Sequence, residues 1–92
     1  MDIKQLYLLA LLLDNTFYPF EMCVLDDGNV EDLRYIQKLL GACHVLGLTL
    51  NIDKSKKEIS IKRGDEVILY RNSLQRSYDL NKLYIEGGWQ YE

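Results

Sequence analysis

Apolar residues are densest near the N-terminus of the chain, where residues 6–13 read LYLLALLL. Over residues 2–13 they recur at intervals of three and four, which predicts a helix. Leucines fill the remaining faces as well, and a helix that is apolar all round must be covered on every side. We therefore expect a central core helix that ends at the polar residues 14–16.

A domain of this size cannot cover every face of such a helix. We expect the inward residues to be Leu6, Leu9, Ala10 and Leu13, packed on Leu33, Ile36 and Leu40 of a second helix. Leu8 or Leu12 is expected nearer the outer face. There it would contact a second copy of the chain, as in a homodimer, or a binding partner.

Residues 17–25, FYPFEMCVL, are ambiguous. Their aromatic and β-branched content suits a strand, whereas Pro19 suits the start of a helix. We interpret them as a short extended segment that leads into a turn.

The clearest periodic pattern predicts an amphipathic helix over residues 29–46. Asn29 is a good N-cap, and Glu31 and Asp32 place negative charge in the first turn, where the helix dipole favours it. The apolar stripe consists of Leu33, Ile36, Leu39, Leu40, Cys43 and Leu46. Gly47 is expected to end the helix.

Three strand-like runs follow: LTLNID at 48–53, EISIKR at 58–63 and DEVILYR at 65–71. The first two alternate between apolar and polar residues, and the third resembles a buried strand. Short, turn-compatible links separate them, which predicts an antiparallel meander. In the tail, either a short helix from Asp79 or a further strand is expected, and Trp89 is expected to pack back on the body.

Length and composition agree with a small single domain over residues 1–92, in the α+β class. Hydrophobic residues make up 48% of the chain and charged residues 27%, as in an ordinary soluble globular protein. Up to Asp53 there are eight acids and three bases, a net charge of −5; from Lys54 onward there are eight bases and six acids, a net charge of +2. The total of −3 argues against a general nucleic-acid binder, which needs accumulated positive charge.

The apolar run is too short to cross a membrane, which takes about 20 apolar residues. The start, MDIK, and the following DNTFYPF lack the basic region and small-residue cleavage site of a secretion signal. We therefore expect a cytoplasmic protein, in the host cytoplasm if it is phage-encoded. Cys23 and Cys43 would then be free thiols that act as small buried hydrophobes.

Motifs for metal binding or catalysis are few. Counted from Asp26, a calcium loop would need glutamate at its twelfth position, where this chain has Gln37. Three cysteines and histidines in total fall short of the four ligands of a structural zinc site. The chain also has no nucleophile elbow and no phosphate-binding loop. We expect a non-enzymatic protein without metal or cofactor, in which RGD at 63–65 is a hairpin turn.

The element order resembles that of a winged helix-turn-helix protein: an apolar helix, a second segment, a helix, then a hairpin with a lysine-rich tip. The resemblance covers roughly residues 2–71 and implies that 29–46 is a recognition helix and 53–57 the wing. Lys54, Lys56 and Lys57 would then contact nucleic acid. The sequence departs from that family at Glu31 and Asp32, because carboxylates there would be repelled by phosphates.

The leading expectation is therefore a small acidic protein that works by binding another protein. In size and charge it resembles the inhibitors encoded by phages and mobile elements, such as anti-CRISPR proteins, which act on a host system that handles nucleic acid. An acidic surface would mimic phosphate; its residues are Glu21, Asp26, Asp27, Glu31 and Asp32. The alternative is a winged-helix-like DNA-binding transcriptional regulator.

Overall fold

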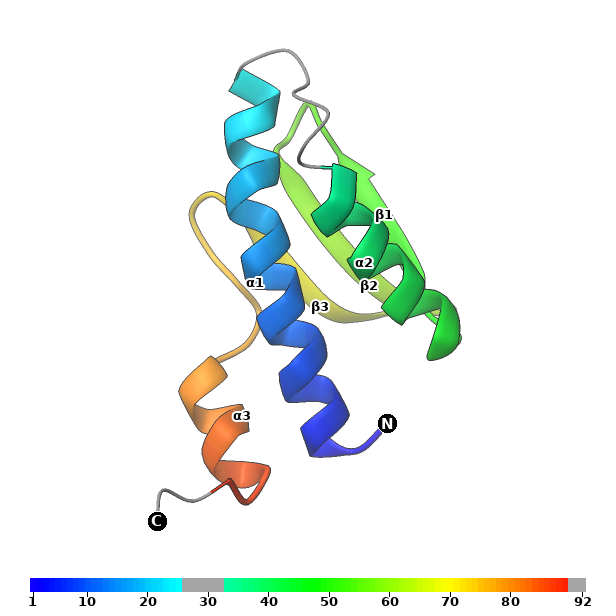
Figure 1. Ribbon diagram of the computed structural model, residues 1–92, viewed down its shortest axis with the longest axis vertical. Coiled ribbons are helices and arrows are strands. Elements are labelled where there is room, and N and C mark those ends of the chain that lie inside the picture. Colours follow the sequence, from blue (N-terminus) through cyan, green and yellow to red (C-terminus); the bar gives the residue numbers. More distant parts are fainter. Residues whose placement is uncertain (26–32, 90–92) are drawn as a thin grey trace.

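The computed structural model describes the backbone of residues 1–25 and 33–89 and the side chains of residues 1–18 and 34–89. The elements are α1 (Ile3–Leu25), α2 (Leu33–Val45), β1 (Thr49–Asp53), β2 (Glu58–Arg63), β3 (Glu66–Asn72) and α3 (Leu80–Glu86). The strands form an antiparallel sheet in the order β1-β2-β3. As Figure 1 shows, α1 and α2 lie side by side on one face of this sheet, and α3 lies beside the N-terminal half of α1. The α+β class and the meander are confirmed.

The first helix is longer than the sequence pattern predicts. Helix α1 continues through residues 14–16 and through 17–25 to Leu25, so both the predicted end and the predicted extended segment are wrong. Thr16 is fully buried, and its hydroxyl donates to the carbonyl of Leu12 one turn earlier at 2.8 Å. A polar side chain that is satisfied by its own helix does not end it.

Helix α2 confirms the second predicted helix over residues 33–45, whereas Asn29, Glu31 and Asp32 lie outside the described residues. Gly47 ends it as expected, with a φ of 71°. The Gly47 amide donates to the His44 carbonyl at 3.2 Å, and the Leu48 amide donates to the Cys43 carbonyl at 2.8 Å. These two bonds make the Schellman motif that a glycine at this position favours.

The two hairpins differ in their turns. Gly64, at the first central position of the β2–β3 turn, has a φ of 62°, which confirms RGD as a turn. The β1–β2 hairpin has the longer loop 54–57, where Lys57 takes a φ of 52°. This loop is held by Asp53, whose Oδ1 accepts from the Ser55 hydroxyl at 2.6 Å and the Lys56 amide at 3.1 Å.

The core lies between α1, α2 and the sheet, and Leu83 of α3 joins it. Its buried apolar residues are Leu9, Ala10, Leu13, Phe17, Leu39, Cys43, Ile59, Ile61, Leu69 and Leu83. The expectation for Leu40 is wrong, because 53% of this residue is exposed. Leu8, at 55% exposed, faces outward as expected, but Leu12 is partly buried and packs against the core.

The tail forms a helix rather than a strand, because Asp79 caps α3. Its carboxylate accepts from the amides of Asn81 at 2.9 Å and Lys82 at 3.2 Å. Trp89 packs back as expected: its ring is stacked on Tyr84 at 5.6 Å and tilted against Tyr7 at 4.7 Å. None of the described helices combines the length and hydrophobicity that crossing a bilayer demands.

Candidate functional site

One face of the sheet is covered by no described helix, and we call it the open face. Ile59 and Ile61 of β2 are buried toward the helices, so Glu58, Ser60 and Lys62 project from the other side. The strand register extends this face into three rows of side chains. They are Asp53–Glu58–Asn72, Asn51–Ser60–Tyr70 and Thr49–Lys62–Val67.

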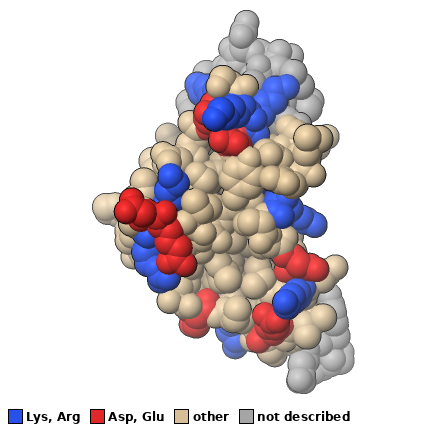
Figure 2. All heavy atoms as spheres, turned by 180° about the vertical axis from the view of Figure 1, so that it is seen from behind, with Lys and Arg blue, Asp and Glu red and all other residues tan. Residues whose placement is uncertain are grey.

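Charge on the open face is concentrated at its ends. Asp53 lies directly across from Glu58 at the end near the 54–57 loop, and Lys62 lies toward the opposite end. The middle row, by contrast, carries only uncharged polar side chains. Figure 2 shows this face, with most charged atoms around its margins and uncharged surface between them.

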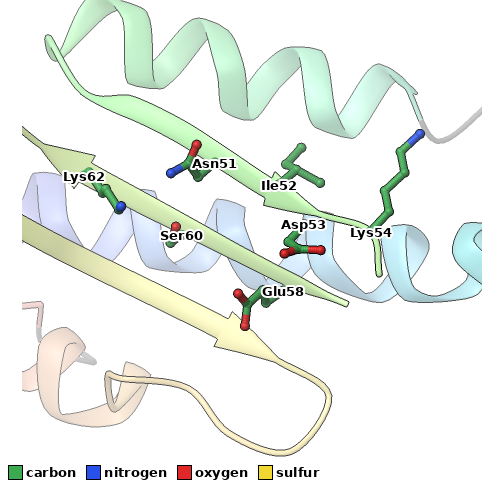
Figure 3. A pocket seen from close by; sticks show the side chains of 7 residues that line it. All are labelled: Asn51, Ile52, Asp53, Lys54, Glu58, Ser60 and Lys62. Atoms are coloured by element: carbon green, nitrogen blue, oxygen red, sulfur yellow. The ribbon is translucent and has the colours of Figure 1, made fainter. Parts of the chain in front are cut away.

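A hollow opens on the β1–β2 half of this face. It is lined by Asn51, Ile52, Asp53, Lys54, Glu58, Ser60 and Lys62. Figure 3 shows the carboxylates of Asp53 and Glu58 close together at one end, with Ser60 between them and Lys62. These groups can donate and accept hydrogen bonds to a surface laid across them.

The β3 half of the open face is fixed by a hydrogen-bonded chain. The Tyr70 hydroxyl donates to Glu58 Oε2 at 2.7 Å, and Asn72 Nδ2 donates to the Tyr70 oxygen at 2.8 Å. The hydrogen bond to Glu58 and then desolvation raise the pKa of Tyr70 above its usual value. The phenol is therefore neutral at pH 7 and held in one orientation.

The amide group of Asn72 is in turn fixed by the chain that follows β3. Its Oδ1 accepts from the amides of Leu74 at 2.8 Å and Gln75 at 2.7 Å. Glu58, Tyr70 and Asn72 thus form one continuous set of bonds anchored in backbone. A phenol held this way loses little conformational entropy when a partner covers it.

A second polar cluster lies between α1 and the segment after β3. Asp14 pairs with Arg76 at 2.6 Å and accepts a hydrogen bond from the Tyr78 hydroxyl. Arg71 Nε lies 3.4 Å from Asp14 without hydrogen-bond geometry, and its guanidinium sits 4.5 Å from the centre of the Phe17 ring. This cluster joins distant parts of the chain, and we assign it to stability.

The structure brings only some of the predicted site residues together. Lys54, Lys56 and Lys57 gather in the β1–β2 loop, the first two exposed and Lys57 partly buried. Leu8 and Leu12 do not share a surface, because one is exposed and the other packs on the core. Among the predicted acidic residues, Glu21 belongs to α1 with its side chain outside the described part, and Asp26, Asp27, Glu31 and Asp32 lie outside the described residues.

Cysteine and histidine are not gathered into a reactive site in the described part of the chain. Cys43 is buried, and desolvation raises the pKa of its thiol, which suppresses the reactive thiolate. His44, the next residue along α2, is exposed. Among residues with described side chains, no three histidine, cysteine or carboxylate groups come close enough to hold a metal ion.

Sequence reasoning missed the open face as a site. The alternation in β1 and β2 could have identified Asn51, Glu58, Ser60 and Lys62 as one polar surface. Tyr70 had no such signal, because β3 reads as a buried-type run. Comparisons with protein-family models, with curated proteins and with solved structures find no match to this chain, so its function must be argued from its surface.

Proposed function

We propose that the protein acts without enzymatic activity, by binding another protein through the open face of its sheet. The observation that carries this proposal is the fixed hydroxyl of Tyr70, held between Glu58 and Asn72 in the uncharged middle of that face. Tyrosine is enriched at the centres of interfaces, where it offers apolar area and a polar tip.

The rest of the open face has the composition of an interface. Val67 is 50% exposed and adds apolar area at one corner, while Asn51 and Ser60 offer uncharged hydrogen-bonding groups beside Tyr70. The charged side chains form the margin. Protein interfaces have the same arrangement, with few charges in the centre and a polar rim.

We further propose that the target handles nucleic acid and that acidic groups take the place of phosphates. On the open face, Asp53 and Glu58 form a neighbouring pair of carboxylates. The sequence carries five further acids between residues 21 and 32, which would add negative charge to the protein. Complementary charge would speed the encounter with a basic groove, and the neutral centre would supply the affinity. In this proposal the protein is a phage or mobile-element inhibitor that acts in the host cytoplasm.

The test is capture of the partner from lysate on immobilised protein, followed by affinity measurements with the purified partner. We expect Tyr70→Ala to weaken binding by roughly 10- to 30-fold, as truncation of a central aromatic residue does. Leu8→Glu is the matched control, since it changes an exposed side chain of α1. Binding that survives Tyr70→Ala but is lost in Leu8→Glu would place the interface on the helices.

The acidic part of the proposal has its own test. If these acids contact the partner, Asp26→Lys with Asp27→Lys should weaken partner binding and leave the thermal midpoint nearly unchanged, since surface charges typically contribute under about 1 kcal/mol to stability. The same measurement at two salt concentrations should show the wild type more salt-sensitive than the variant. If the wild type and the double variant bind the partner with equal affinity, these acids do not mimic phosphate. The uncharged middle of the open face would then account for binding.

The alternative function is DNA binding by the β1–β2 loop, and the exposed Lys54 and Lys56 favour it. The element order speaks against it, because residues 17–25 belong to α1 and form no separate second helix. A gel shift decides between the two. Salt-sensitive DNA binding that is lost in Lys54→Glu with Lys56→Glu supports the regulator.

A further inference from the structure

The two edges of the sheet differ in how they are protected. Beyond β3, the chain returns and covers the edge: the Asn72 amide donates to the Gln75 carbonyl at 2.9 Å and the Ser77 amide to the Tyr70 carbonyl at 3.0 Å. The Tyr70 amide also donates to the Ser77 hydroxyl at 2.9 Å. The outer edge of β3 is thus already occupied at its C-terminal end, over residues 70–72.

The outer edge of β1 has no such cover within the described part of the chain. β1 pairs with β2 on one side only, and α2 lies above its inward face (Figure 1). Natural edge strands are protected by charged side chains, above all lysine, by proline or by a bulge within the strand. The sequence TLNID has no lysine or proline and carries its one charge, Asp53, at its C-terminal end, and the irregularity of the sheet lies between β2 and β3.

Apolar side chains lie along this edge. Leu50 and Ile52 point toward the helices but are only partly buried, because no strand flanks them on the outside. Leu40 lies on an exposed flank of α2. Helix geometry puts it opposite Ala42 and Leu46, which are partly covered by the core.

We propose that β1 pairs antiparallel with β1 of a second copy of this chain, which joins the two sheets into one six-stranded sheet. All five residues of β1 pair when the register is centred on Asn51, so that Asn51 of one copy lies opposite Asn51 of the other. A two-fold axis perpendicular to the sheet then passes between the two Asn51 residues. This symmetry leaves the helices of both copies on the same side of the joined sheet, where Leu40 of each copy approaches the two-fold axis.

Charge on the open face fits this pairing and argues for a second copy over an unrelated strand. Asp53 and Glu58 are like charges directly opposite each other, an unfavourable pair in an isolated sheet. The antiparallel register brings Thr49 of the second copy beside Asp53, and Lys62 of that copy lies in the same row on the next strand. In each half of the joined sheet, the Asp53–Glu58 pair of one copy therefore shares a row with Lys62 of the other.

Sedimentation velocity over a range of protein concentrations tests the pairing with purified protein alone. We expect the wild type to show a concentration-dependent dimer. Asn51→Lys places two lysines opposite each other and should weaken the dimer by about fivefold or more. Val67→Lys adds the same charge to the same face on the far strand and should leave the dimer unchanged, as should the small β-forming substitution Asn51→Thr.

Circular dichroism of the variants checks that each is folded, since Asn51 and Val67 are both exposed. Amide hydrogen exchange gives a second readout, in which the β1 amides should become more protected as concentration rises. A wild type that stays monomeric up to about 1 mM overturns the proposal. A dimer that survives Asn51→Lys but is lost in Leu8→Glu overturns it as well, because the contact would then lie on α1.

Discussion

The carboxylate of Asp14, in the middle of α1, accepts a hydrogen bond from the hydroxyl of Tyr78, 64 residues further along the chain. The same carboxylate pairs with Arg76 at 2.6 Å and lies 3.4 Å from Arg71 Nε. Only 17% of the Asp14 side chain is exposed, so these groups replace most of its water. One acidic side chain thus links the first helix to the segment that leads into α3.

Replacing Asp14 should therefore destabilise the fold. In Asp14→Ala, Tyr78 loses its acceptor and two arginines lose their counter-charge, which should lower the free energy of unfolding by about 2–3 kcal/mol. Urea denaturation followed by circular dichroism measures this change. Asn15→Ala, at the exposed neighbouring position, is the control and should stay within about 0.5 kcal/mol of the wild type.

Tyr78 should make the fold sensitive to alkaline pH. Burial, and then the hydrogen bond to Asp14, raise its pKa far above the ordinary value for tyrosine. A pKa raised in the folded state gives stability that is present below the unfolded pKa of about 10 and is lost as pH rises above it. Stability should thus fall above that pH in the wild type and fall less steeply in Tyr78→Phe. Parallel curves for the two proteins would contradict this account.

Leu8 and Leu12 give a matched pair on one helix. Leu12→Glu puts a charge against the core and should destabilise the protein by several kcal/mol, whereas Leu8→Glu should change stability little. Leu9→Ala, at a position only 3% exposed, should cost about 2–5 kcal/mol because it leaves a cavity. The melting temperatures of the three variants rank these effects. Equal melting temperatures for Leu8→Glu and Leu12→Glu would refute the burial of Leu12.

Gly87 makes room for the ring of Trp89. A Cβ at Gly87 would lie 2.5 Å from one ring carbon of Trp89 and 3.1 Å from the Leu83 carbonyl oxygen, so Gly87→Ala should displace the indole from Tyr84. Trp89 is the one tryptophan of the chain, and its fluorescence should shift to the red as it becomes exposed.

Gly41→Ala in α2 is the matched control for this substitution. A Cβ there meets nothing within 4 Å, and alanine is the better helix former, so the variant should gain up to about 1 kcal/mol. An unchanged emission spectrum in Gly87→Ala would show that the tryptophan does not depend on this glycine.

Some of this protein is determined by local sequence alone. The apolar stripe of α2 and Gly47 fixed that helix and its end, because a left-handed residue after a helix is a local preference of glycine. The alternation in β1 and β2 set their pairing, since a shift of one residue would turn Ile59 and Ile61 away from the core. Asp79 capped α3 for a similarly local reason.

Other features were decided only by the tertiary structure. Asp14 and Thr16 look like a helix end in the sequence, yet α1 runs through both, because Tyr78 and the arginines satisfy the carboxylate and Leu12 accepts from the threonine. Leu40 is exposed where the sequence predicts burial, and of Leu8 and Leu12 it is Leu8 that faces outward, since the crossing of α1 and α2 sets which flank of each helix is covered. The open face of the sheet and the uncovered outer edge of β1 are likewise set by where the helices pack. The alternation of apolar and polar residues along a strand shows which side chains share a face of the sheet. The packing of the helices decides which of the two faces stays open.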